Sequence, residues 1–230
     1  MTTLTASRRM PLRAAAICGL LALVTVTVAY IWGALAQPDA YRSADDASSD
    51  LGALTANKAW IYNQIGDNLT GILIILFGLG LWRALSPDVL GRIGAGAVML
   101  MGLGIFVTGF FPLDCRGIDP GCTNDSWHSL AHKWDNRFLN AVAFAAPLIL
   151  AFAFRRLPQW RGLWLPTLLV LPVSAAVGVL FSGIGDGAAQ RAGNIILVLW
   201  IGLLAWPLMR LADGRTVRPT VDLTSTLPER

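Results

Sequence analysis

The sequence predicts an all-α integral membrane protein, a polytopic bundle of six transmembrane helices with both termini in the cytoplasm. Of its 230 residues, 55% are hydrophobic and only 14% are charged, and the mean hydropathy is +0.58. A soluble globular domain carries about a quarter charged residues. Because so few charges are available to cover a surface in water, the solvent around this chain has to be lipid.

Six apolar stretches are long enough to cross the membrane, since a transmembrane helix needs about 20 mostly apolar residues. A cytoplasmic segment over 1–11 precedes them, the six-helix domain occupies 12–209, and 210–230 forms a cytoplasmic tail that we expect to be disordered. The predicted spans are Leu12 to Ala36, Ile61 to Leu85, Arg92 to Phe111, Arg137 to Phe154, Gly162 to Ser182 and Ala192 to Met209.

The distribution of basic residues predicts the orientation. Lys and Arg accumulate on the cytoplasmic side of membrane proteins, and twelve of the 18 here flank one side of the predicted spans. The net charge of +4 is therefore a topology signal and does not indicate a nucleic-acid partner. We expect a multi-pass protein of the bacterial plasma membrane whose general partner is the lipid bilayer.

The first span has a rival interpretation as a cleavable signal peptide, because Ala34-Leu35-Ala36 resembles a small-residue cleavage site. Its apolar core runs from Ala14 to Trp32, which is longer than the roughly 7 to 15 residues of a signal core. The length favours an uncleaved helix. Cleavage would leave five helices in the same orientation.

Polar residues that are unusual near a membrane span gather on the predicted outer face. Ionisable residues at such positions are hypotheses for function because they are costly there. We predict a polar cap in which Asp67, Asn68, Asp186 and Arg191 lie at a depth similar to that of Asp114. The acidic stretch 42–50 in the first outer loop carries few apolar residues, and we expect it to be mobile.

Two cysteines in the second outer loop, Cys115 and Cys122, are expected to form a disulfide. Disulfides persist on the oxidising side of the membrane, and the CxxC spacing of a dithiol oxidoreductase is lacking. The bridge would close a short loop and hold Asp114 near the start of the fourth helix.

The two histidines suggest a metal site as an alternative to a structural role. His128 and His132 are four residues apart, so on a helix both rings lie on one face. Together with Asp114 they could hold Zn²⁺, and Asp114 would be the catalytic candidate, as ligand or base. The structural alternative is that the pair hydrogen-bonds to the adjacent loop. Two rings one turn apart cannot ligate opposite faces of a haem.

The segment Gly109-Phe110-Phe111-Pro112-Leu113-Asp114, followed by the cysteine pair and by His128 at the start of a helix, resembles the bacterial membrane family called domain of unknown function 998. The resemblance implies a six-helix membrane protein with an uncharacterised activity. A looser similarity to the alkaline ceramidase and adiponectin receptor group implies zinc held by His and Asp, but those proteins have seven helices.

Two functions follow as expectations. The first is an integral membrane protein of the bacterial cell envelope without an assignable biochemical activity, whose polar site lies on the extracytoplasmic face and could take a lipid ligand. The alternative is a zinc-dependent lipid hydrolase that acts at the outer leaflet, with a metal-bound water as nucleophile.

Overall fold

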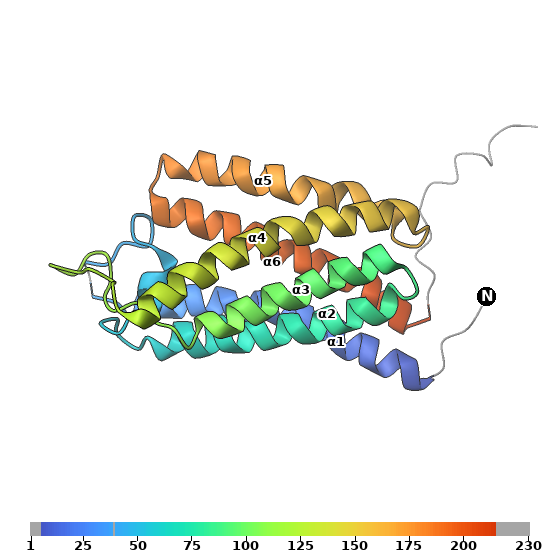
Figure 1. Cartoon of the computed structure of the whole chain (residues 1–230), viewed down its shortest axis with the longest axis horizontal. Helices are drawn as coiled ribbons and strands as arrows, with labels where there is room; N and C mark the ends of the chain where they lie inside the picture. Colours follow the sequence, from blue (N-terminus) through green and yellow to red (C-terminus); the bar gives the residue numbers. More distant parts are fainter. Residues whose placement is uncertain (1–5, 39, 215–230) are drawn as a thin grey trace, which may run out of the picture.

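The computed structural model describes residues 6–38 and 40–214, and the regular elements within these ranges are all helical. Six of these helices are long and apolar enough to cross a membrane, and they form an elongated bundle (Figure 1). The predicted all-α architecture is confirmed. In chain order the elements are α1 Ala6–Leu35, η1 Ser48–Gly52, η2 Ile61–Leu69, α2 Thr70–Ala84, α3 Val89–Thr108, α4 Trp127–Arg156, η3 Arg161–Leu163, α5 Trp164–Ser182 and α6 Asp186–Ala212.

Three helices begin six or more residues earlier than hydropathy predicts. The fourth span starts at Trp127 instead of Arg137, because the Ser126 side chain caps it by accepting a hydrogen bond from Ser129 N at 3.3 Å. The first turns of α4 are therefore helical although their residues are polar. The same holds for α6, which starts at Asp186 instead of Ala192. Likewise α1 starts at Ala6 instead of Leu12, and the predicted tail is described only to residue 214.

The second span changes its helical type along its length. It begins as the π-helix η2 and continues without a break as α2. π-helical turns are rare and often occur at functional sites, since they widen the helix and redirect its side chains. Asp67 and Asn68 lie in this π-helical stretch.

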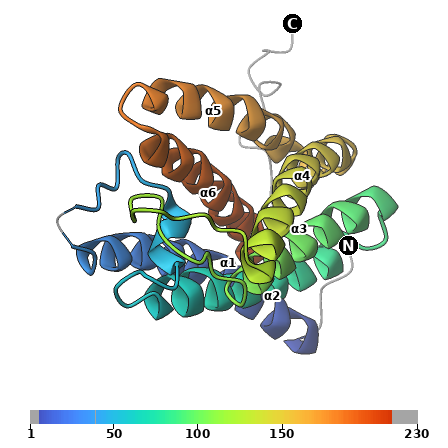
Figure 2. The same ribbon diagram turned by 60° about the vertical axis from the view of Figure 1, so that its left-hand side comes forward.

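The helices pack in a defined order around the bundle. α1 packs against α2 and α6, α3 lies between α2 and α4, and α5 packs on α6 and α4. In Figure 2, α5 lies at the edge of the bundle, and only its Thr167 and Val170 are buried. The remaining apolar surface of α5 therefore faces the hydrocarbon, as expected of a lipid-exposed helix.

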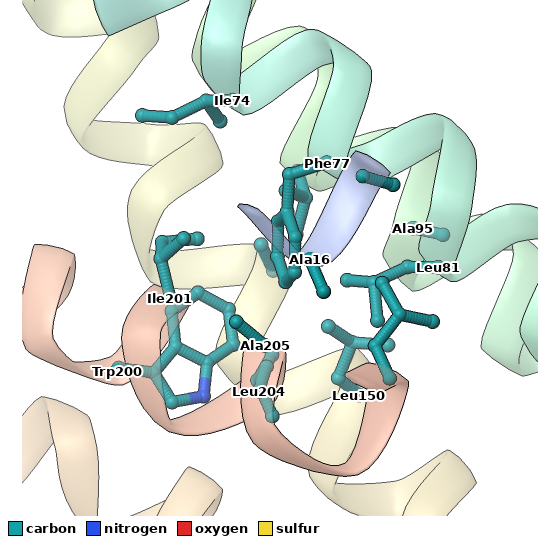
Figure 3. Packing of buried hydrophobic residues seen from close by; sticks show 14 of the residues in the cluster. Ala16, Ile74, Phe77, Leu81, Ala95, Leu150, Trp200, Ile201, Leu204 and Ala205 are labelled. Carbon is teal, nitrogen blue, oxygen red and sulfur yellow. The ribbon is translucent and has the colours of Figure 1, made fainter. Parts of the chain in front are cut away.

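One half of the bundle has a dry apolar core. Figure 3 shows Phe77, Leu81, Leu150 and Leu204 meeting between α2, α4 and α6, and all four side chains are fully buried. Lipid tails are as apolar as leucine, so these contacts stabilise the bundle through close packing.

Close backbone approach between α2 and α3 depends on a glycine. A Cβ atom at Gly71 would lie 2.5 Å from the backbone nitrogen of Phe106 and 2.6 Å from the carbonyl oxygen of Gly102. Neither backbone atom can rotate away. Small residues at this crossing therefore allow the two helices to approach each other, as is common in membrane bundles.

The two ends of the bundle differ in their connections. Short segments, 85–88 and 157–163, join the helices at the end that we call the arginine-rich end. Arg92 there stacks over Trp82 at 4.5 Å, and Arg210 over Trp206 at 5.1 Å. Such Arg and Trp side chains are typical of the membrane interface. The opposite end, which we call the loop-rich end, carries the segments 36–60, 109–126 and 183–185.

The acidic part of the first long loop, which its composition predicts to be mobile, makes specific contacts with α6. Arg191 on α6 donates hydrogen bonds to the carbonyl oxygens of Ser43 at 2.6 Å and Asp46 at 2.8 Å. The backbone nitrogen of Ala188 donates to the carbonyl of Ala44 at 2.7 Å. Together with the bond from Gly187 N to the carbonyl of Asp45, this contact satisfies two of the free N–H groups at the start of α6, and a distant part of the chain supplies the acceptors.

Candidate functional site

Asp114 organises the second loop at the loop-rich end. Its carboxylate accepts a hydrogen bond from Ser126 N at 3.1 Å, and its own backbone nitrogen donates to Ser129 Oγ at 2.9 Å. The hydrogen bonds from Ser126 hold the pKa of Asp114 below its usual value. The carboxylate therefore holds the loop against the first turn of α4.

Both histidines bind this loop to α4 through their Nδ1 atoms. His128 Nδ1 lies 2.8 Å from the carbonyl oxygen of Pro112, and His132 Nδ1 lies 2.9 Å from that of Phe111. Each contact requires a proton on Nδ1, because a carbonyl oxygen only accepts. The geometry matches the structural alternative, in which the pair hydrogen-bonds to the adjacent loop.

Of the three residues predicted to hold zinc, the structure brings His128 and Asp114 together and gives His132 another partner. His128 Nε2 faces Asp114 Oδ1 at 3.2 Å, whereas His132 Nε2 lies 3.4 Å from the amide nitrogen of Asn136. Within residues 6–38 and 40–214, no group of three or more His, Cys, Asp or Glu side chains is arranged to hold a metal ion. The zinc site and the catalytic role of Asp114 remain predictions, without a preassembled ligand set to support them.

The predicted disulfide between Cys115 and Cys122 is present, with the two Cα atoms 5.7 Å apart. Asn124 lies beside it and makes two hydrogen bonds with the backbone of Cys115. The Asn124 Nδ2 atom donates to the Cys115 carbonyl oxygen at 3.0 Å, and the Asn124 Oδ1 atom accepts from the Cys115 backbone nitrogen at 3.1 Å. The loop is therefore a compact, cross-linked unit.

An ion pair inside the disulfide loop joins it to the first loop. Arg116 Nη2 lies 2.6 Å from Asp119 Oδ1, and the Thr55 hydroxyl also donates to this carboxylate. The hydrogen bonds from Arg116 lower the pKa of Asp119 to about 2. Gly117 N in turn donates to Asp50 Oδ2 at 3.1 Å, and burial raises the pKa of Asp50. The two long loops thus form one layer.

Beneath this layer the bundle encloses a cavity of about 350 Å³. Helices α1, α3, α4, α6 and the η2–α2 helix contribute to its wall, together with η1. Its polar lining consists of Tyr30, Ser48, Ser49, Tyr62, Asp67, Thr70, Thr108, His132, Asn136, Arg137, Asn140, Gln190 and Asn194. Its apolar lining includes Val26, Ile74, Met101, Ile105, Leu139, Ala143, Leu197, Val198 and Ile201.

Asp67 is the most unusual group on the cavity wall. Its side chain is 9% exposed, and its Oδ2 atom has no hydrogen-bond partner among the described residues. The neighbouring Asn68 donates to the carbonyl of Phe106 at 2.6 Å, and its own Oδ1 also lacks a partner in the described chain. A buried carboxylate without a partner costs on the order of several kcal/mol.

A second carboxylate is hydrogen-bonded to Thr108, a residue that lines the cavity. Asp135 on α4 accepts a hydrogen bond from the Thr108 hydroxyl at 2.5 Å, and it lies close enough to Asp67 to repel its charge. Two carboxylates near each other favour a proton, a cation or a hydrogen-bond donor between or beside them.

Two tyrosines complete the polar wall. The rings of Tyr30 and Tyr62 stack with their centroids 6.1 Å apart. Asn194 on α6 donates to the Tyr30 hydroxyl at 3.2 Å, and the Tyr62 hydroxyl donates to Ser48 Oγ at 3.3 Å. These contacts join α6 to α1 and η2 to η1 at the cavity.

The cavity lies between helices that diverge from each other. α4 packs mainly against α3 and α5, whereas α6 packs mainly against α1 and α5. Both α4 and α6 line the cavity, and α5 contributes no described residue to its lining. Arg137 and Asn140 on α4 line the cavity and are also exposed, so this side opens to the surroundings of the bundle.

The polar cap predicted from the sequence is divided among three places. Asp114 belongs to the loop layer, and Arg191 binds the first loop. Asp67 lines the cavity, whereas the neighbouring Asn68 bonds to the backbone of α3. Asp186 is exposed in the first turn of α6. The sequence interpretation missed Tyr30 and Tyr62, although the chain has only 3 tyrosines and all of them fall near this end, a signal that could have pointed to the cavity.

Comparison with known proteins gives one match. No curated protein and no solved structure matches the chain, whereas the model of the family described as "Protein of unknown function (DUF998)" matches residues 16–207. The match covers nearly all of the six helices and confirms the resemblance seen in the segment around Asp114. The chain therefore belongs to the DUF998 family.

Proposed function

We propose that this integral membrane protein binds an amphipathic, lipid-like molecule in the cavity, with the polar end of the ligand toward the loop layer. The observation that carries the proposal is a single cavity whose polar wall continues into an apolar wall. Its volume of about 350 Å³ lies within the range of small-molecule sites, about 300–1,000 Å³. A ligand with only polar or only apolar groups would leave half of this wall unmatched.

The two kinds of lining residue are separated along the helices. On α4, Asn136 lies seven residues before Ala143, and both line the cavity. At 1.5 Å per residue this is about 10 Å along the helix. Such a distance suits a polar headgroup followed by the first part of a hydrocarbon chain.

The exposed side chains of α4 support entry from the bilayer. Phe138 and Phe144 on the outer surface of α4 are exposed, which is expected of side chains in contact with lipid tails. A lipid could therefore reach the cavity sideways without leaving the membrane.

We further propose that the loop-rich end faces the extracytoplasmic side of the bacterial plasma membrane. Two observations support this orientation. Disulfides such as Cys115–Cys122 persist on the oxidising side, and the excess of arginine lies at the other end, as cytoplasmic loops require. The ligand would then come from the outer leaflet.

Filling the cavity tests the proposal. Ala143 lines the cavity and is 7% exposed, so Ala143→Leu would occupy the space beside the apolar wall. Ala141, two residues earlier, is exposed on the same helix and does not line the cavity, so Ala141→Leu is the matched control. We expect native mass spectrometry of the purified protein to show retained lipid in the wild type and in Ala141→Leu, and a loss of it in Ala143→Leu.

Two outcomes of this measurement would contradict the proposal. If Ala143→Leu keeps the same retained lipid as the wild type at an unchanged melting temperature, the cavity is not the binding place and the proposal fails. Absence of tightly retained lipid from all three proteins would overturn it as well.

A further inference from the structure

Two opposite charges face the same cavity without a partner in the described chain. Asp67 has a buried oxygen that meets no donor, and it forms no ion pair with a described residue. Arg137 lines the same cavity and is exposed. Its guanidinium stacks over Trp134 at 4.5 Å, and none of the ion pairs between described residues includes it.

The chemistry at Asp67 calls for a donor that carries positive charge. A buried carboxylate that lacks a partner is strongly disfavoured, and the nearby Asp135 adds repulsion. The described residues hold no three-ligand set for a metal ion. An ammonium group with N–H bonds can donate to this carboxylate and also offset its negative charge.

The chemistry at Arg137 calls for an anion. Guanidinium groups bind phosphate through two parallel N–H···O bonds. The guanidinium stacks on the exposed Trp134, and interfacial Trp and Arg side chains lie at the level of lipid headgroups. The exposed Asn140 beside it also lines the cavity and adds a donor for phosphate or ester oxygens.

We infer that the ligand is a zwitterionic aminophospholipid, such as phosphatidylethanolamine, whose ammonium binds Asp67 and whose phosphate binds Arg137. The inference rests on the proposed lipid-binding function and specifies the headgroup. A trimethylammonium group has no N–H to donate, so phosphatidylcholine would leave the Asp67 oxygen unpaired. Phosphatidylglycerol offers the phosphate without the cation.

The first test compares headgroups in the full-length protein. Purified protein is exchanged into nanodiscs that contain equal parts of phosphatidylethanolamine, phosphatidylcholine and phosphatidylglycerol with identical acyl chains, and the lipids retained after release into detergent are counted by native mass spectrometry. We expect the wild type to retain the ethanolamine lipid about tenfold over the other two, which corresponds to one charge-assisted hydrogen bond.

The second test assigns this preference to Asp67. Asp67→Asn removes the negative charge, so this variant should retain the three lipids in about equal amounts. Asp67→Glu keeps the charge and should keep the preference for the ethanolamine lipid. Asp125→Asn is the matched control, because Asp125 is an exposed carboxylate of the same end that does not line the cavity. If Asp67→Asn fails to fold, the headgroup comparison in the wild type still decides the inference.

The third test addresses Arg137. Arg137→Gln should lower retention of all three phospholipids by a similar factor, since each carries the phosphate. Arg210→Gln is the control, because Arg210 also stacks on a tryptophan but lies at the arginine-rich end. Equal loss in both variants would show that Arg137 acts only through the interface and would overturn its role as phosphate ligand.

The outcomes separate the inference from the proposed function. Equal retention of the three headgroups by the wild type, lost in Ala143→Leu, would overturn the aminophospholipid while the cavity remains a lipid site. Retention that Ala143→Leu does not change would instead overturn the proposed function.

Discussion

The two halves of the helix bundle differ in what occupies the space between their helices. Toward the arginine-rich end, Phe77, Leu81 and Leu150 are fully buried and fill the space between the helices (Figure 3). Toward the loop-rich end, the same helices surround a cavity lined by Asp67, Thr108 and other polar groups. The first half is built for packing and the second for polar contacts.

The difference teaches where to look for function in a bundle that lacks a recognisable catalytic motif. Polar groups inside a membrane protein are tolerated when they are paired. Most of those at the cavity are paired, for example Thr108 with Asp135 and Asn194 with Tyr30. Asp67 has an unpaired oxygen among the described residues, and this exception points to a partner from outside the chain.

The largest expected effect compares matched leucines of α4 in the two halves. Leu150 is fully buried in the dry core, and Leu139 lines the cavity. Leu150→Ala should lower the free energy of unfolding by about 2–5 kcal/mol, because it leaves a hole in close-packed surroundings. Leu139→Ala should cost less than half as much, since it only enlarges a space that already exists. Unfolding in mixed micelles with denaturant measures both.

Equal destabilisation by the two substitutions would contradict this comparison, because it would mean that the side chains around Leu139 are as closely packed as those around Leu150. Addition of the retained lipid should narrow the contrast, since Leu139→Ala then also loses contacts with the ligand, whereas Leu150 does not contact the ligand.

A smaller effect is expected where the first loop is attached to α6. Arg191→Gln removes the guanidinium that donates to Ser43 and Asp46. The free energy of local opening should fall by about 2 kcal/mol, as expected for hydrogen bonds from a charged group. Hydrogen–deuterium exchange of the amides in 41–50 measures it. Arg42→Gln, at an arginine whose side chain is 75% exposed, should change exchange little, and unchanged protection in Arg191→Gln would refute the anchoring role.

The smallest effect is a pH dependence that belongs to the loop-rich end alone. Because Arg116 lowers the pKa of Asp119 to about 2 in the folded loop, this carboxylate stabilises the loop fully above its unfolded pKa of about 3.9. The contribution is lost as the pH falls through about 2. Asp114, whose pKa is also lowered, acts in the same direction.

Limited digestion with pepsin measures this acid sensitivity, because the enzyme is active throughout the range. Cleavage near Leu113 should rise between pH 4 and pH 2 in the wild type, and Asp119→Asn should be cleaved readily across the whole range. A wild-type loop that resists pepsin equally at both values would contradict the role assigned to the Arg116–Asp119 pair.

The sequence predicts the architecture well because hydropathy reports directly on it. The six spans, the disulfide between Cys115 and Cys122 and the family resemblance around Asp114 are all found. Each depends on a local property: a run of apolar residues, a spacing of thiols or a short motif. The starts of α4 and α6 are less predictable, because their first turns are polar and are stabilised by capping and by contacts with loops.

The order of the first loop could not be predicted from its composition. Its acidic and small residues resemble a disordered segment, but Tyr41 and Leu51 are buried and Arg191, far along the chain, binds its carbonyl groups. A contact between residues about 150 positions apart leaves no local signal.

The cavity was only partly predictable. Asp67 and His132 stand out as ionisable residues near spans, and both line it. Tyr30, Gln190 and Asn194 resemble ordinary interfacial or interhelical residues in the sequence, and only the crossing of α1, α4 and α6 brings them together.

An experimental structure of the protein in lipid nanodiscs that contain phosphatidylethanolamine tests the central claim most directly. We predict elongated density between α4 and α6 that enters the cavity, with its polar end beside Asp67 and its hydrocarbon part along Ala143 and Ile201. A cavity closed by side chains, or one that holds no density apart from ordered water, would contradict the assignment of this site to an amphipathic ligand.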